Sequence, residues 1–350
     1  MSTRSVRTVA ICHPQIPFVH GGTELLVTAL RDELVARGYE ATLVSIPFRW
    51  YPRDQIGRSC LVWRMIDLSE SNGRKIDLVI GTKFPSYVVK HERKVTWLVH
   101  QFRQVYDLFG TEFSEFRSNA QDEAVREMVV RIDGKTLPES RRIFAISHTV
   151  QERLRRFNGI ECTTLHPPPR GRERFQPGES GDYVLGVGRL ERTKRLHLLI
   201  EAMRFTDASL HCVLVGRGPE EAALRALASE VGVADRVEFR GDVHFDELVS
   251  LYRDCLAVFN APFQEDYGLV TVEAFLSHKP VVTAPDSGGP LEFVEDEVTG
   301  VVVEAQGEKI GERLRQLHAD RRRANSLGRA GFERVKHIGW DPVIHELLSA

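Results

Sequence analysis

The sequence predicts an α/β protein of two domains, each with a parallel sheet and covering helices. Three observations support this fold class. Residues 256–292 follow the order strand, loop, helix, strand, loop, helix start, which is typical of a parallel α/β sheet. The chain has 350 residues, more than one hydrophobic core usually serves. A proline-rich stretch at 164–181 interrupts the alternation, which then starts again.

Composition narrows the functional classes. A chain with 42% hydrophobic and 27% charged residues is globular rather than disordered. A formal net charge of −2 argues against a dedicated nucleic-acid binder. No apolar run approaches the ~20 residues of a membrane span, and the polar start, MSTRSVR, does not read as a signal peptide. The five scattered cysteines are typical of core thiols, so we expect a cytoplasmic protein.

Short apolar runs bounded by turn residues give the expected strands of the first half. These are Thr8 to Cys12, Ala41 to Ile46, Ile76 to Ile80, Thr96 to Val99 and Arg142 to Ile146. A helix with one apolar face separates the first two runs and ends at Gly38. The loop before it contains the diglycine Gly21-Gly22 in place of a dinucleotide-binding fingerprint.

The second half repeats this alternation. Its expected strands are Tyr183 to Val187, Ser209 to Gly216, Val237 to Phe239, Leu256 to Phe259, Pro280 to Ala284 and Val301 to Val303. After Val303 the chain is predicted to be helical and is rich in basic residues, and its last helix is expected over Ile338 to Ala350. We therefore expect two Rossmann-like halves.

The stretch 259–292 carries the clearest functional pattern. Ligands of parallel sheets bind at the carboxyl ends of the strands, where Gly268 begins a helix whose free amides and dipole favour an anion. Glu265 precedes this helix, and Glu273 lies within it, on the order of 7 Å along the axis from Gly268 at ~1.5 Å per residue. Two carboxylates can thus bracket a ligand whose phosphates rest on the helix start. This arrangement predicts a nucleotide-sugar.

The same residues resemble a known family. Glu265, seven intervening residues and Glu273, within EDYGLVTVEAF, resemble the E-x7-E signature of family 4 retaining glycosyltransferases, the group 1 glycosyl transferases. The similarity continues through KPVVTAPDSGGPLEFVEDEVTG and covers most of the second half, but the first half only loosely. It implies the GT-B architecture, in which two Rossmann-like domains face a central cleft. It also implies retaining transfer of a hexose from a nucleotide-diphospho-sugar co-substrate, without a metal or other cofactor.

The resemblance assigns roles to individual residues. It places Glu265 on the sugar hydroxyls and Glu273 on the ribose. It assigns the diphosphate to two cations of the loop GRLERTKR and to three amides at the helix start: Arg189, Lys194, Gly268, Leu269 and Val270. Without the glutamate motif, the loop GRLERTKR would read as a solvated run of charges.

Three further candidates come from other loops. His100 ends the strand Thr96 to Val99 and matches a family histidine that faces the donor sugar near the reacting carbon; a structural histidine is the alternative. Gly22 and Gly216 are donor-binding candidates. The resemblance places the loop of Gly22 over the donor phosphates or the acceptor, and the alternative is that its glycines only make the turn.

The resemblance also implies a domain plan: residues 1–168 for the acceptor, a linker at 169–181, residues 182–337 for the donor, and a helix at 338–350 that crosses back. The acceptor is expected to be a saccharide or a lipid-linked saccharide of cell-surface polysaccharide or glycoconjugate biosynthesis. The stretch Arg49 to Arg64 is rich in arginine and aromatic residues, which suits either a solvated surface or peripheral contact with the inner face of the membrane.

Two other functions remain open. A glycoside hydrolase would also use paired carboxylates but would not need Arg189 and Lys194. A non-catalytic sensor would bind the nucleotide-sugar without turnover. No D-x-D, H-E-x-x-H or G-x-G-x-x-G pattern occurs, which weakens metal-dependent transferase, metallohydrolase and dehydrogenase interpretations.

Overall fold

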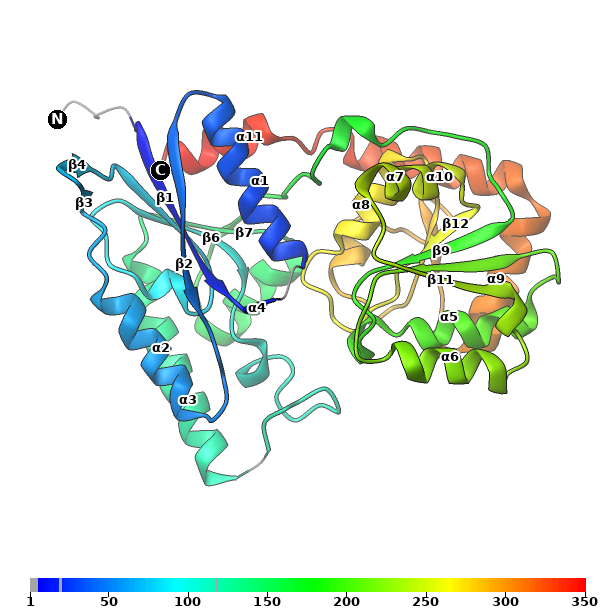
Figure 1. The fold of residues 1–350 in the computed structure, drawn as a ribbon, viewed down its shortest axis with the longest axis horizontal. Helices are drawn as coiled ribbons and strands as arrows, with labels where there is room; N and C mark the ends of the chain where they lie inside the picture. The colour runs from blue at the N-terminus through cyan, green and yellow to red at the C-terminus, as the bar shows by residue number, and fades with distance from the viewer. Residues whose placement is uncertain (1–5, 19–20, 118) are drawn as a thin grey trace. The chain divides into compact units, whose positions relative to one another are not determined.

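The protein is described by a computed structural model of residues 6–18, 21–117 and 119–350. Most of the start that the signal-peptide interpretation concerned, and residues 19–20 of the first loop, lie outside the described residues. The chain forms two compact units, Met1–Arg170 with Gly339–Ala350, and Gly171–Ile338. Each unit is a sheet flanked by helices (Figure 1). Within the described ranges, no helix combines the length and apolar character needed to cross a membrane.

The first unit is built on a six-stranded sheet of order β2-β1-β5-β6-β7-β8, in which every neighbouring pair is parallel. The strands are β1 (Thr8–Gln15), β2 (Glu40–Pro47), β5 (Leu78–Lys83), β6 (Lys94–His100), β7 (Arg142–Ala145) and β8 (Thr163–Thr164). The helices are α1 (Gly22–Ala36), α2 (Asp54–Met65), α3 (Ala120–Thr136) and α4 (His148–Asn158), and β3 (Glu70–Ser71) pairs with β4 (Arg74–Lys75) in a short hairpin. The edge strand β8, only two residues long, was not predicted from the sequence.

The second unit has a six-stranded parallel sheet of order β11-β10-β9-β12-β13-β14. Its strands are β9 (Tyr183–Val187), β10 (His211–Val215), β11 (Val237–Gly241), β12 (Ala257–Phe259), β13 (Val281–Thr283) and β14 (Gly300–Val302). Its helices are α5 (Leu196–Ala202), α6 (Glu221–Glu230), α7 (Phe245–Asp254), α8 (Leu269–Leu276), α9 (Gly307–Ala319) and α10 (Arg321–Val335). Counted within the unit, this order is 3-2-1-4-5-6, the order of a Rossmann sheet, and the strand order reverses between the parallel neighbours β9 and β12.

Burial explains why these runs form strands. All residues of β5 and β12 are buried, as expected for parallel strands that are covered by helices on both faces. The core of the second unit is aliphatic and includes Leu199, Leu214 and Val282. Helix α10 approaches α8 closely because Gly331 lacks a side chain: a Cβ there would lie 2.3 Å from the ring of Phe275.

The last helix, α11 (Trp340–Leu348), packs on the first unit. The ring of Trp340 meets that of Trp97 in β6 edge to face, with centroids 6.3 Å apart. Arg142 and Glu346 form an ion pair at 3.0 Å. The first unit is therefore completed by a segment that follows the second unit in the sequence.

This packing can be tested by replacing Trp340 with alanine. The side chain is only 8% exposed, so its removal leaves a cavity against Trp97. We expect the free energy of unfolding to fall by roughly 3–5 kcal/mol, measured by urea denaturation. Trp50→Ala is the control, because Trp50 is partly exposed, and it should cost clearly less. Equal losses in the two variants would contradict the described packing of α11.

Candidate functional site

The loops after β12 and β13 lie against each other at the carboxyl edge of the second sheet. Backbone hydrogen bonds run from Gln264 N to Asp286 O at 2.9 Å, from Glu265 N to Ser287 O at 2.8 Å, and from Gly289 N to Glu265 O at 2.9 Å. The backbone of Glu265 is thus held on both sides. Its carboxylate is presented from a fixed loop at the point where the sheet reverses its strand order.

Two glycines allow this approach. Gly268 precedes α8 with φ 77°, and a Cβ on it would lie 2.7 Å from the ring of Pro290. A Cβ on Gly289 would lie 2.5 Å from the backbone of Tyr267. Any larger residue would push the loops apart. The first turn of α8 follows directly, and the amides of such a turn have no carbonyl partner within the helix.

Lys194 and Glu265 form an ion pair between the loops that follow β9 and β12. Lys194 ends a 3₁₀ turn at Arg192–Lys194, and about a quarter of each side chain is exposed. Burial lowers the pKa of Lys194, but the Glu265 carboxylate more than offsets this, so that the pKa is raised overall. The structure therefore brings together two residues that the sequence assigned to one ligand, although their contact could not be foreseen.

Arg189 and Gly216 lie on the neighbouring loops. Arg189 follows β9, its side chain is 53% exposed, and its Nε lies 3.6 Å from the carboxylate of Glu191. Gly216 follows β10 with φ 125°, and a Cβ on it would lie 2.1 Å from Gly188 O. Gly216 thus allows the loops after β9 and β10 to touch. Both residues lie on the carboxyl side of their strands.

Glu273 has a separate partner. Its Oε2 accepts a hydrogen bond from the hydroxyl of Tyr252 at 2.7 Å. Burial raises the pKa of the Glu273 carboxyl to about 7, and the hydrogen bond from Tyr252 opposes that rise. Tyr252 lies in α7 and is fully buried, and no sequence pattern indicated its contact with Glu273.

Arg195, the last residue of the motif GRLERTKR, was also missed. Its guanidinium donates two bonds to the carboxylate of Asp286, at 2.6 and 2.8 Å, and further bonds to Ala261 O at 2.8 Å and Pro262 O at 2.9 Å. The side chain is buried and the residue has φ 51°. Arg195 therefore ties the loops after β9, β12 and β13 together, and its neighbour Lys194 contributes its side chain to the ion pair.

In the first unit, Gly22 begins α1 beside a largely buried cluster of charges. The Glu24 carboxylate accepts a bond from Gly21 N at 2.9 Å and lies 3.3 Å from His13 Nε2 and 3.4 Å from Lys83 Nζ. Burial raises the pKa of Glu24. The hydrogen bond from His13 and the charge of Lys83 lower it by more, so that the pKa falls to about 2. The cluster lies where β1 and β5 adjoin, which is the point of strand reversal in this sheet. Sequence reasoning found Gly22 but none of the charged residues.

His100 ends β6 beside the last residue of β5, Lys83, with which it is paired in the sheet. Its Nδ1 lies 2.6 Å from Gln101 O. A carbonyl oxygen can only accept, so Nδ1 carries the hydrogen in a neutral ring. The predicted position of His100 at the carboxyl tip of a strand is therefore observed, whereas its role remains a prediction.

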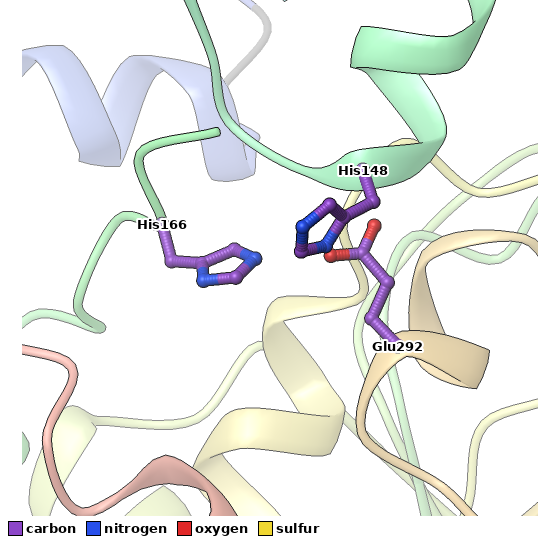
Figure 2. Close-up of side chains that lie close together, drawn as sticks. All are labelled: His148, His166 and Glu292. Carbon is purple, nitrogen blue, oxygen red and sulfur yellow. The ribbon is translucent and has the colours of Figure 1, made fainter. Parts of the chain in front are cut away.

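Two more histidines approach each other in the first unit. Figure 2 shows His148 at the start of α4 and His166 on the segment after β8, and their ring centroids lie 5.5 Å apart. Metal sites of zinc proteins usually have three or four protein ligands. The two histidines of this unit do not by themselves make up such a set. We therefore assign no metal to it.

The stretch Arg49 to Arg64 differs from the predicted exposed basic and aromatic surface. Trp63 is buried with 1% exposure. Arg53 stacks on Phe116, and Arg64 forms a two-bond ion pair with Glu139 at 2.6 and 2.7 Å. The prediction was wrong for these three side chains, because most of the stretch is helix α2, whose inner face packs on the unit.

Sequence comparison gives the family of the second unit. Residues 170–334 match the family described as glycosyl transferases group 1. This segment, just under half of the chain, is similar to the group 1 glycosyl transferases. The family resemblance inferred from the two glutamates is thereby confirmed.

Curated relatives match about half of this chain. A GDP-mannose-dependent alpha-(1-6)-phosphatidylinositol monomannoside mannosyltransferase of Mycobacterium tuberculosis is 33% identical over 210 residues, which are 55% of this chain and 53% of that protein. A D-inositol 3-phosphate glycosyltransferase of Salinispora tropica is 33% identical over 191 residues, 51% of this chain and 39% of that protein. The chain therefore spans about half the length, or less, of these relatives.

Solved structures resemble the whole chain. Sucrose-phosphate synthase from Thermosynechococcus elongatus has a TM-score of 0.78 at 20% identity, covering 97% of both chains. Anabaena HepE in complex with UDP and glucose has a TM-score of 0.73 at 16% identity, covering 98% of this chain and 100% of that chain. WaaG, a glycosyltransferase involved in lipopolysaccharide biosynthesis, has a TM-score of 0.69 at 16% identity, covering 97% and 98%. These similarities confirm the predicted GT-B fold of two Rossmann-like domains.

The raised pKa of Glu273 gives a pH test. The folded state holds this proton to about pH 7, whereas the ordinary pKa is 4.5, so the folded state binds it more tightly than the unfolded chain does. The resulting stabilisation is complete below about pH 4.5 and is lost as the pH rises to about 7. Across that window, urea denaturation should show the wild type losing stability relative to Glu273→Gln. A constant difference between the two proteins would contradict the raised pKa.

Proposed function

We propose that the protein transfers a hexose from a nucleotide-diphospho-sugar to a saccharide or lipid-linked saccharide, with retention of anomeric configuration and without an essential metal. The observation that carries the proposal is the contact between Lys194 and Glu265. In a nucleotide-sugar, the hexose is bonded directly to the terminal phosphate. A cation for that phosphate and a carboxylate for the sugar hydroxyls must therefore lie side by side, as these two residues do.

The proposed reaction uses charges at the edge of the second sheet. Lys194, Arg189 and the amides at the start of α8 hold the diphosphate and stabilise the negative charge that grows as the glycosidic bond breaks; one preorganised donor of this kind is worth ~2.7–4 kcal/mol. Glu265 accepts bonds from the sugar hydroxyls. A phosphate oxygen of the donor takes the proton of the attacking acceptor hydroxyl, and the acceptor enters on the face that the phosphate leaves. His100 is assigned to the donor sugar near the reacting carbon.

Glu273 is assigned to the ribose of the nucleotide. A carboxylate can accept bonds from both ribose hydroxyls, and Tyr252 orients this one through its hydroxyl. Its raised pKa means that it is ionised above about pH 7 and accepts best there. Gly22 and Gly216 are assigned to the close approach of backbone and donor, as glycines that leave room at the carboxyl ends of β1 and β10.

The relatives support the choice of substrates. The mycobacterial relative is named for GDP-mannose and for a phosphatidylinositol mannoside, and HepE is described with UDP-glucose. We therefore propose GDP-mannose and UDP-glucose as the first donors to test. The names of the relatives also favour an acceptor that carries an inositol phosphate or a glycolipid head group.

The test of the function is a thermal-shift screen with these two donors, followed by an assay for release of the nucleoside diphosphate with glycolipid acceptors. Stabilisation by a donor and acceptor-dependent release support a transferase. Stabilisation without release with any acceptor supports the sensor instead. Cleavage of a free oligosaccharide without nucleotide supports the hydrolase, for which the cation beside Glu265 would have no purpose.

The variants Glu265→Gln and Lys194→Gln should differ in what they impair: turnover in the first and binding of the diphosphate in the second. Glu265→Gln should lower turnover roughly 10- to 150-fold, because one charged hydrogen bond to the sugar is worth roughly 1.5–3 kcal/mol. It should not weaken binding of the nucleoside diphosphate, because it also removes the carboxylate that competes for Lys194. Lys194→Gln should weaken binding of the diphosphate and of the whole donor, but not of the free nucleoside. Calorimetry and steady-state kinetics measure both effects.

A matched pair of arginines controls for general loss of charge. Arg189→Gln should also weaken diphosphate binding, whereas Arg225→Gln should not, although the two side chains are equally exposed at 53% and 54%. Near-normal turnover of Glu265→Gln, or unchanged diphosphate affinity of Lys194→Gln and Arg189→Gln, would remove these residues from the proposed site.

A lipid-linked acceptor requires contact with a membrane. We propose that the outer face of α2 contacts the cytoplasmic face of that membrane. Three apolar side chains are exposed there, Leu61 at 58%, Val62 at 46% and Met65 at 75%, on the same helix as Arg58, which is 71% exposed and pairs with Asp54 at 3.0 Å. Apolar groups beside a cation suit the surface of an anionic membrane. This replaces the predicted contact through Trp63, which is buried.

Flotation with anionic vesicles tests this surface. Val62→Ser should reduce binding, because each methylene lost from the interface costs ~0.8 kcal/mol, or about 4-fold in affinity. The identical change Val298→Ser is the control: that side chain is 45% exposed on the second unit and is not part of the proposed surface. Equal binding of the two variants, or equal binding to neutral vesicles at low salt, would contradict the membrane contact.

A further inference from the structure

A carboxylate lies in the core of the first unit without a cation among its hydrogen-bond partners. Asp133, in α3, is fully buried. Its Oδ1 accepts from the hydroxyl of Tyr87 at 2.9 Å and its Oδ2 from the hydroxyl of Tyr106 at 2.7 Å. Burying an ionisable group against neutral partners is costly, so the fold alone gives little reason for a carboxyl here.

The carboxylate is one end of a chain of side-chain hydrogen bonds. The hydroxyl of Tyr106 accepts from Asn158 Nδ2 at 3.2 Å, and Asn158 Oδ1 accepts from Gln101 Nε2. From Gln101 to Asp133, every donor points in the same direction. Bonds aligned in this way polarise and strengthen one another, and an acceptor of high charge density at the end favours the whole series.

The other end of the chain reaches His100. Gln101 directly follows β6, its side chain is 98% buried, and its carbonyl accepts from His100 Nδ1 at 2.6 Å. The hydrogen bond to Asn158 restrains the side chain of Gln101 and, through the shared Cα, the direction of its backbone carbonyl. The direction of that carbonyl decides which ring nitrogen of His100 carries the hydrogen and which one is offered to a ligand.

We propose that Asp133 is a positioning residue that, through Tyr106, Asn158 and Gln101, holds His100 in one tautomer and orientation. The proposal rests on the proposed function only in giving His100 a task at the donor sugar; the coupling between Asp133 and His100 stands apart from it. Such a device suits a residue at a strand tip, because an orienting partner defines which ring nitrogen carries the hydrogen.

The two tyrosines provide a matched test. Tyr87→Phe and Tyr106→Phe each remove one buried hydroxyl that donates to Asp133, but only Tyr106 continues to Asn158. We expect long-range ¹H–¹⁵N spectra of the ligand-free protein to show His100 protonated on Nδ1 in the wild type and in Tyr87→Phe. In Tyr106→Phe, this signal should change to a mixture of tautomers. Comparison with His100→Asn identifies the resonance among the 13 histidines.

Asn158→Ala interrupts the same series of hydrogen bonds at a second point. Asn158 is half-buried, so the substitution is less of a risk to folding. Tyr106→Phe and Asn158→Ala should both lower kcat roughly 10- to 100-fold, as loss of an orienting partner typically does, with the KM for the donor little changed. A His100 signal that is unchanged in both variants, or changed equally by Tyr87→Phe, would overturn the proposal. A changed signal with normal kcat would support the positioning and contradict the role of His100 at the sugar.

Discussion

The candidate site depends on the hydrogen bonds that the guanidinium of Arg195 donates. Its bonds to Asp286, Ala261 and Pro262 join loops that leave β9, β12 and β13. Removing one partner of a buried, hydrogen-bonded ion pair is strongly destabilising, because the other charge is left without compensation. The backbone pairing of Glu265 with Ser287 and Gly289 lies beside this anchor, and the contact of Lys194 with Glu265 is built upon both. The loops after β9, β12 and β13 are thus held together, and they present the opposite charges of Lys194 and Glu265 at the edge of the sheet.

Three acidic groups that are buried or half-buried show how the hydrogen-bond partner sets the pKa of a carboxyl. Glu24 has His13 and Lys83 beside it, and its pKa falls to about 2. Asp133 and Glu273 are hydrogen-bonded to tyrosine hydroxyls, and burial raises the pKa of each to about 7. A hydroxyl stabilises the ionised form less than a cation does, so desolvation dominates. Glu24 is therefore a permanent anion near Gly22, whereas Asp133 and Glu273 can change charge near neutral pH.

Much of the fold could be predicted because its causes are local in the sequence. Strands such as 78–80 and 256–259 are short apolar runs between turn residues, and Gly268 marks the start of α8 by its freedom to adopt positive φ. The pairing of β7 with the two-residue strand β8 could not be predicted, because so short a run carries no periodicity. The interpretation of 49–64 failed for a related reason. It counted arginine and tryptophan along the chain, whereas the helical period turned Trp63 and Arg64 towards the unit and Leu61 and Val62 towards solvent.

The site could be predicted only as far as spacing along one segment determines it. Glu265, Gly268 and Glu273 are close in sequence, so their order on a loop and a helix follows from helix geometry. Lys194 and Glu265 are 71 positions apart, and their contact follows from strand order, since β9 and β12 are neighbours in the sheet. The same logic explains the cluster of His13, Glu24 and Lys83, where β1 and β5 are neighbours although some 70 residues separate them. In both sheets, charged residues from distant segments meet where the strand order reverses, because only there do two loops leave adjacent strands towards opposite sides and open a space between them.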